Sequence, residues 1–279
     1  MFEVAVPVVA AVVLWWASTG VILYLDGLPR RTFKWSLLAV IALGFAALIA
    51  AISVSADVSV TSAFVGFAAG LLIWSVPTAA FYFGVVTGPR RGPMPVGLAG
   101  WPRFRAAVET MLYHELLCIA GALVLTLVLW SAPNKMALWT YLVLWAMHVS
   151  GKLNMFFGVP NLSEEFLPPH LAYLASYMRT RPMNLLFPLS VSLATIATAT
   201  LAALAWMSPA GSHDAVGATL LAVLAGLAVL EHWLLVLPLS PMALWNWSLK
   251  SRSITPAAVP PASDAAFRRP VFETGPRAE

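Results

Sequence analysis

Long apolar runs constrain this chain more than any other feature of its sequence. Each run holds about 20 mainly apolar residues, enough for an α-helix to cross ~30 Å of hydrocarbon. Strands are not expected, because no run alternates with a period of two and open sheet edges cannot face lipid. The sequence therefore predicts an all-α polytopic membrane protein, a bundle of about seven transmembrane helices at residues 3–25, 35–54, 62–86, 106–130, 136–158, 184–207 and 215–238.

The composition agrees with this fold class. Hydrophobic residues make up 60% of the chain and charged residues only 10%, against roughly 25% charged residues in soluble domains. The basic residues flank the apolar runs, as in membrane topology signals, so the expected partner is the lipid bilayer and not nucleic acid. The single cysteine, Cys118, excludes an internal disulfide and a thiolate metal cluster and is expected to have a packing role.

The distribution of lysine and arginine predicts the orientation in the membrane. Fifteen of the 16 basic residues follow the first, third, fifth or seventh run, and only Lys135 lies on the other side. By the positive-inside rule this places the N-terminus outside, in the periplasm, and the C-terminus in the cytoplasm. The first run lacks a basic region and a small-residue cleavage site, so we expect it to be a retained span.

Two further helices are expected on the cytoplasmic side, in the membrane interface. The first covers about 168–180, where two prolines can open a helix and Leu171, Leu174 and Met178 share one face. The second covers about 241–250 and carries two tryptophans. Both have the amphipathic composition of helices that lie on a membrane.

The C-terminal end differs from the rest of the chain. Residues 253–279 contain five prolines and little apolar pattern. This composition predicts a disordered cytoplasmic tail. By contrast, Gly66 and Gly70 in the third run form a small-residue face that favours close helix packing.

Ionisable side chains within spans are costly and are therefore candidates for function. At ~1.5 Å per residue, five of them lie ~9–15 Å from the cytoplasmic ends of the fourth, fifth and seventh spans: His114, Glu115, His148, Glu231 and His232. The polar segment 161–181 comes from the same side. We therefore expect a polar pocket between these spans, covered by 161–181, with candidate residues His114, Glu115, His148, Lys152, Glu231 and His232 from the spans and Glu164, Glu165 and His170 from the segment.

Several kinds of chemistry could use such a pocket. A non-haem iron or zinc site would draw on imidazole and carboxylate ligands, with His114, Glu115, Glu231 and His232 as weak candidates, although no H-E-x-x-H spacing occurs. A tetrapyrrole site would need one histidine to reach the central metal. An ion path would need carboxylates across the whole membrane, but the outer half has almost none.

A structural role is the simplest alternative. Buried charges must be paired, and Glu115 with Lys152, together with Glu231 and an interfacial arginine, would suffice. His213, in the outer loop SPAGSHD, is expected to be solvated. No nucleophile, base or metal motif has the spacing that catalysis requires.

Several segments of the chain resemble a known family. They are GLPRRTFKWS (27–36), VTGPRR (86–91), LYHEL (112–116), KLNMFFGVPNLSEEFLPPHLAYLASYMRTRPMNLLFP (152–188) and LEHWLLVLPL (230–239). In order and spacing they are similar to the photosynthetic complex assembly protein 2 (PuhE) family, whose members are encoded with the reaction-centre H subunit in purple phototrophic bacteria.

The resemblance implies a seven-span protein of the bacterial inner membrane. It also implies a role in assembly of the reaction centre and light-harvesting complexes, through bacteriochlorophyll or a precursor tetrapyrrole, with photosystem subunits or pigment-synthesis proteins as partners. No catalytic residues can be carried over from the family. The expectation is a non-enzymatic assembly factor, and the alternative is a membrane enzyme or enzyme subunit of bacteriochlorophyll metabolism that uses the histidine and glutamate pocket.

Overall fold

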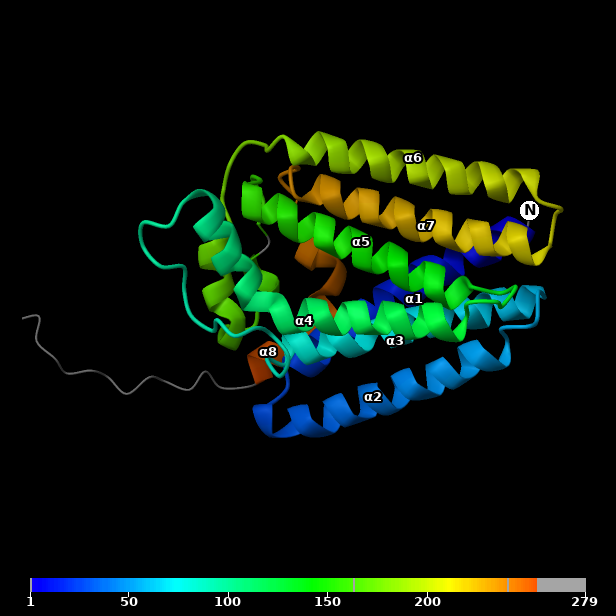
Figure 1. Ribbon diagram of the computed structural model, residues 1–279, viewed down its shortest axis with the longest axis horizontal. Helices are drawn as coiled ribbons and strands as arrows, with labels where there is room; N and C mark the ends of the chain where they lie inside the picture. The colour runs from blue at the N-terminus through cyan, green and yellow to red at the C-terminus, as the bar shows by residue number, and fades with distance from the viewer. Residues whose placement is uncertain (1, 163, 240, 255–279) are drawn as a thin grey trace, which may run out of the picture.

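The computed structural model describes residues 2–162, 164–239 and 241–254, and this part of the chain is all-α, as expected. It contains no strand beyond an isolated bridge between Val159 and Thr180. The long helices are α1 (Phe2–Asp26), α2 (Arg30–Ser53), α3 (Val60–Tyr82), α4 (Gly100–Val128), α5 (Met136–Phe157), α6 (Leu186–Met207) and α7 (His213–Leu234). They lie side by side as an elongated bundle (Figure 1).

Six of these helices are long and apolar enough to cross a membrane: α1, α2, α3, α4, α6 and α7. The chain is therefore a multi-pass membrane protein. Helix α5 has 22 residues and lies within the bundle beside α4 and α7 (Figure 1), but its second half carries His148, Ser150, Lys152 and Asn154. Its role as a seventh span stays a prediction.

Helix α3 lies at the centre of the bundle and contacts α1, α2, α4, α5 and α7. The small-residue face predicted from Gly66 and Gly70 packs on α5. A Cβ atom at Gly66 would lie 2.7 Å from the Cβ of Met136, and one at Gly70 would lie 2.6 Å from that of Thr140. Glycine is therefore needed at both positions for α3 and α5 to approach this closely. Helices α2 and α6 form the two edges (Figure 1).

One end of the bundle gathers the connections rich in arginine. Helices α1, α3, α5 and α7 end there, and the loop between α3 and α4 supplies Arg90 and Arg91. We call this the arginine-rich end. The N-terminus lies at the opposite end, which carries Lys135 (Figure 1).

The helix expected at 168–180 is present but differs in type. The segment forms two 3₁₀ helices, η1 (Glu164–Phe166) and η2 (Pro169–Tyr177). The buried residues of η2 are Leu171, Leu174 and Tyr177, a spacing of three that matches the 3.0 residues per turn of a 3₁₀ helix. Met178, which an α-helical repeat places on this face, follows the end of η2; it is partly buried and lines the same cavity as Leu174 and Tyr177.

The segment expected to lie in the interface at 241–250 instead packs along α1. It forms η3 (Pro241–Trp245) and α8 (Asn246–Ile254). Trp16 Nε1 donates to the Leu244 carbonyl at 2.8 Å, and further along both segments Arg252 pairs with Asp26 at 2.8 Å. These contacts span ten residues of α1, or ~15 Å, so the chain turns back into the bundle after α7 and then runs out beside α1.

The tail predicted as disordered from residue 253 begins two residues too early, because α8 continues to Ile254. Residues 255–279 lie outside the described residues.

Candidate functional site

His114 on α4 is a fully buried histidine with both ring nitrogens engaged. Its Nδ1 donates to the Pro77 carbonyl on α3 at 3.2 Å. Its Nε2 then keeps a lone pair, which faces the Cys118 thiol at 3.6 Å. The ring also packs on Phe81, with centroids 4.7 Å apart. His114 is therefore a packing group between α3 and α4.

His148 on α5 is the histidine next to it. The ring centroids of His114 and His148 are 5.7 Å apart. The ring of Trp74, on α3, also packs against His148, with centroids 5.5 Å apart. The Nε2 atom of His148 is buried and has no hydrogen-bond partner within the described part of the chain. A buried polar atom without a partner is rare and needs an explanation.

Glu115 and Lys152 form an ion pair between α4 and α5. Trp145 Nε1 also donates to Glu115, at 3.3 Å. This is the pairing that the structural alternative expects for these two residues. The second pairing of that alternative is absent, because Glu231 has no ion pair with an arginine among the residues described.

Glu231 and His232 are neighbours on α7 but face different surroundings. His232 is buried and contacts Ser150 on α5, with Nε2 at 2.9 Å from the hydroxyl oxygen, while Nδ1 donates to the Ala228 carbonyl at 2.8 Å. Glu231 faces a cavity instead. The structure therefore does not bring Glu231 and His232 into one pocket, because consecutive residues on a helix point about 100° apart.

The 161–181 segment covers the arginine-rich end and joins several helix ends. Asn161 Nδ2 donates to the Leu234 and Leu239 carbonyls, each at 2.9 Å. Arg103, a buried residue of α4, donates to the Tyr177 carbonyl at 2.6 Å. Hydrogen bonds in both directions thus tie the segment to α4 and to the end of α7, where Asn161 satisfies a carbonyl that a helix end leaves without a partner.

The remaining candidates of this segment lie apart from the histidines of the spans. His170 Nε2 bonds the Tyr82 carbonyl at the end of α3, at 2.7 Å, and Glu164 is exposed. Glu165 lies in η1, and its side chain is outside the described part of the structure.

An apolar cavity of about 120 Å³ lies beneath the 161–181 segment. Leu167, Leu174 and Tyr177 cover it, and His148 and Lys152 reach it from α5. The expectation that this segment covers a cavity next to α4 and α5 therefore agrees with the geometry, although the lining is mainly apolar.

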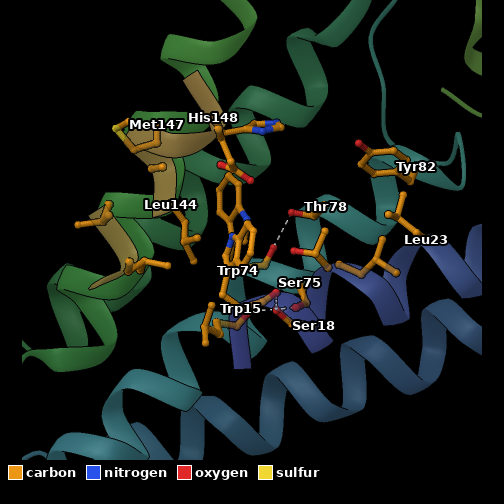
Figure 2. A pocket seen from close by; sticks show the side chains of 17 residues that line it. Trp15, Ser18, Leu23, Trp74, Ser75, Thr78, Tyr82, Leu144, Met147 and His148 are labelled. Atoms are coloured by element: carbon orange, nitrogen blue, oxygen red, sulfur yellow. Dashed lines mark hydrogen bonds between the residues drawn. The ribbon is translucent and has the colours of Figure 1, made fainter. Parts of the chain in front are cut away.

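A second cavity, of about 190 Å³, lies between α1, α3, α5 and α7. Figure 2 shows Trp15 and Ser18 from α1, Trp74, Ser75, Thr78 and Tyr82 from α3, and His148 from α5 around it. Glu231 completes the lining from α7. We call it the Glu231 cavity. Glu231 is one of the candidates named from the sequence, but the residues that surround it in this cavity are mostly not the expected ones.

A larger groove, of about 590 Å³, lies at the opposite end of the bundle between α5, α6 and α7. Trp139, Leu204 and Leu221 are among its apolar lining residues, and His213 also lines it. His213 Nδ1 lies 3.0 Å from the Ser59 carbonyl. Because a carbonyl only accepts, Nδ1 carries the proton and Nε2 keeps its lone pair.

Sequence reasoning missed this residue. It placed His213 in a solvated loop, whereas His213 is the first residue of α7 and contacts the beginning of α3. The contact joins residues 154 positions apart, so no local signal could have identified it.

These distances decide which ligands the candidate residues can hold. Within the described ranges, no group of three or more histidine, cysteine, aspartate or glutamate side chains is placed to bind a metal ion. The 190 Å³ of the Glu231 cavity is below the ~300–1,000 Å³ of sites for larger organic ligands, so a tetrapyrrole does not fit there. The groove beside His213, of about 590 Å³, falls within this range.

The comparisons with known proteins agree with the segments that suggested a family. The family model described as a protein of unknown function, DUF3623, matches residues 1–255. The chain belongs to this family. An uncharacterized 30.4 kDa protein in the puhA 5′ region of Rhodobacter capsulatus is 38% identical over 246 residues, which cover 85% of this chain and 88% of the relative. No solved structure matches significantly.

Proposed function

We propose that this protein is a membrane factor for assembly of the bacterial photosynthetic apparatus. The observation that carries the proposal is the relative encoded in the puhA 5′ region of a phototroph. The resemblance to a family encoded with the reaction-centre H subunit supports the same role. An assembly factor of this kind would work in the inner membrane beside nascent reaction-centre and light-harvesting subunits.

We further propose that the factor handles bacteriochlorophyll or a precursor at the groove beside His213. The central metal of a tetrapyrrole takes one axial imidazole nitrogen. A histidine that ligates a metal typically donates its other ring N–H to a carbonyl or carboxylate, which fixes its tautomer. His213 meets this requirement through Ser59. The apolar lining, which includes Trp139 and Leu204, suits a flat macrocycle.

Two histidines of the spans, His114 and His232, are less suited to this role. Both ring nitrogens of His114 and of His232 are already engaged with protein groups. A pigment at either residue would have to break these contacts. The alternative of a membrane enzyme with a histidine and glutamate metal site has less support, because these side chains do not converge within the described residues.

Absorption spectra of the protein purified from phototrophically grown cells in mild detergent test the pigment proposal. We expect a near-infrared pigment band that is lost in His213→Gln, since an amide does not replace the axial imidazole. His170→Gln, at the arginine-rich end, is the matched control and should retain the band. A colourless wild-type protein, or a band that persists in His213→Gln, contradicts pigment handling at this groove.

A further inference from the structure

Glu231 carries a carboxyl group in the candidate span α7; it lines the Glu231 cavity and is an exposed residue. Two other acidic groups of the arginine-rich half are paired, Glu115 with Lys152 and Asp26 with Arg252. Glu231 has no hydrogen bond or ion pair to any residue of the described ranges. A carboxyl group inside a span is costly unless a proton or a cation neutralises it. Glu231 therefore needs either a proton or a cation to neutralise it.

Most polar groups around the Glu231 cavity can accept a hydrogen bond from a ligand but cannot donate one. Ser18, Ser75 and Thr78 each donate their hydroxyl proton to a carbonyl of their own helix, at 2.9–3.0 Å (dashed lines in Figure 2). Their oxygen atoms can then only accept a further hydrogen bond. Together with the Glu231 carboxylate, they match a ligand that brings N–H or O–H groups.

The walls of the cavity favour a cation among such ligands. The indole rings of Trp15 and Trp74 line it (Figure 2), and Tyr82 lines it as well. Aromatic faces attract ammonium groups through the ring quadrupole, by ~0.5–2 kcal/mol. The combination of an unpaired carboxylate, hydroxyl acceptors and aromatic walls is that of a site for an organic ammonium ion.

The size of the cavity limits the ligand to a small one. An engineered cavity of about 150 Å³ binds benzene, and the Glu231 cavity measures about 190 Å³. A primary amine that carries one ring-sized apolar group therefore fits. A second cavity, of about 160 Å³, shares Trp15 and Glu231 with it and lies against Leu244 and Trp245.

We propose that the cavity between α1, α3, α5 and α7 is a binding site for a small primary ammonium ion, held by the Glu231 carboxylate, the hydroxyl oxygens of Ser18, Ser75 and Thr78, and the faces of Trp15 and Trp74. His148, whose buried Nε2 has no hydrogen-bond partner within the described residues, belongs to the same lining. The inference depends on the cavity alone and does not rest on a role in photosystem assembly.

Calorimetry with the purified full chain in detergent tests the proposal with two probes of equal shape, benzylammonium chloride and benzyl alcohol. We expect benzylammonium to bind at least about tenfold more tightly than the alcohol, because a charge-assisted hydrogen bond to a carboxylate is stronger than a neutral one. Equal binding of the two probes, or no saturable binding of benzylammonium, overturns the proposal.

Variants assign the binding to Glu231. Glu231→Gln should weaken benzylammonium by at least about tenfold and leave benzyl alcohol unchanged, and Glu231→Asp should restore part of the affinity. Glu109→Gln, which removes a carboxylate paired with Arg90 and Arg105 elsewhere on the protein, is the matched control. Unchanged benzylammonium binding in Glu231→Gln contradicts the assignment.

A measurement on the wild-type protein avoids dependence on folded variants. A lipid-soluble carbodiimide should modify Glu231, and benzylammonium should protect it, as read by mass spectrometry of the peptide that contains it. Modification at the same rate with and without benzylammonium contradicts the proposal.

Discussion

Glu115 on α4 and Lys152 on α5 form an ion pair whose side chains are only 22% and 14% exposed. The pair joins the two helices, and Trp145 adds a hydrogen bond to the same carboxylate. Because both side chains are largely buried, removal of either charge would leave the other without a neutralising partner.

Lys152→Met should destabilise the protein by about 3 kcal/mol, because loss of one partner leaves a largely buried charge unpaired. The double variant Glu115→Gln/Lys152→Met should recover much of this loss. Denaturant unfolding in detergent measures both. Lys135→Met, at the opposite end, is the control. A Lys152→Met protein no less stable than this control would show that the pair contributes nothing.

Gly88→Ala should disrupt the packing of the loop between α3 and α4 on helix α4. A Cβ atom at Gly88 would lie 2.1 Å from the Glu109 carbonyl oxygen, a backbone atom that cannot move aside. Gly92→Ala, in the same loop, would meet nothing within 4 Å and should be neutral. Melting temperatures of the two variants provide the comparison. Equal values would contradict the close approach.

Arg103→Ala should loosen the 161–181 segment without unfolding the bundle. The guanidinium group holds the Tyr177 and Phe156 carbonyls and stacks on Phe156 at 4.0 Å. Hydrogen exchange should therefore rise in 169–177 and stay unchanged in α7. Arg105→Ala removes a mostly exposed side chain and should have little effect, since surface ion pairs contribute only ~0–1 kcal/mol. Equal exchange in both variants would argue against this role of Arg103.

His170 should make the arginine-rich end sensitive to acid. Burial lowers the pKa of its imidazole below the usual 6.5, and Arg30 and Arg252 act in the same direction. The unfolded state therefore binds a proton first as the pH falls, so the contribution of His170 is complete above pH 6.5 and is lost below it. Unfolding at pH 7.5 and 5.5 should show a larger loss in the wild type than in His170→Gln. An equal loss in both would show that another group is responsible.

The sequence predicts the helices well where apolar pattern alone decides their ends. Helix α5 ends within one residue of the predicted 136–158. Helix α3 ends at Tyr82, four residues before the predicted limit of 86, because Gly84 adopts a φ of +71°. This left-handed conformation ends a helix, and hydrophobicity does not report it.

The candidate site was harder to predict, because depth along a helix does not give direction around it. Glu231 and His232 lie at the same depth yet face a cavity and α5 respectively. The pairing of Glu115 with Lys152 could be predicted, since few other partners exist at that level. The contact of His213 with Ser59 could not, because it depends on how α7 meets α3.

The central claim is that this protein assists assembly of the photosynthetic apparatus. The most direct test is the near-infrared absorption of membranes from a phototroph that lacks it, with growth conditions and total protein matched to the wild type. We predict a loss of reaction-centre and light-harvesting bands that the wild-type chain restores and His213→Gln does not. Bands of normal height in the deletion strain would contradict the claim.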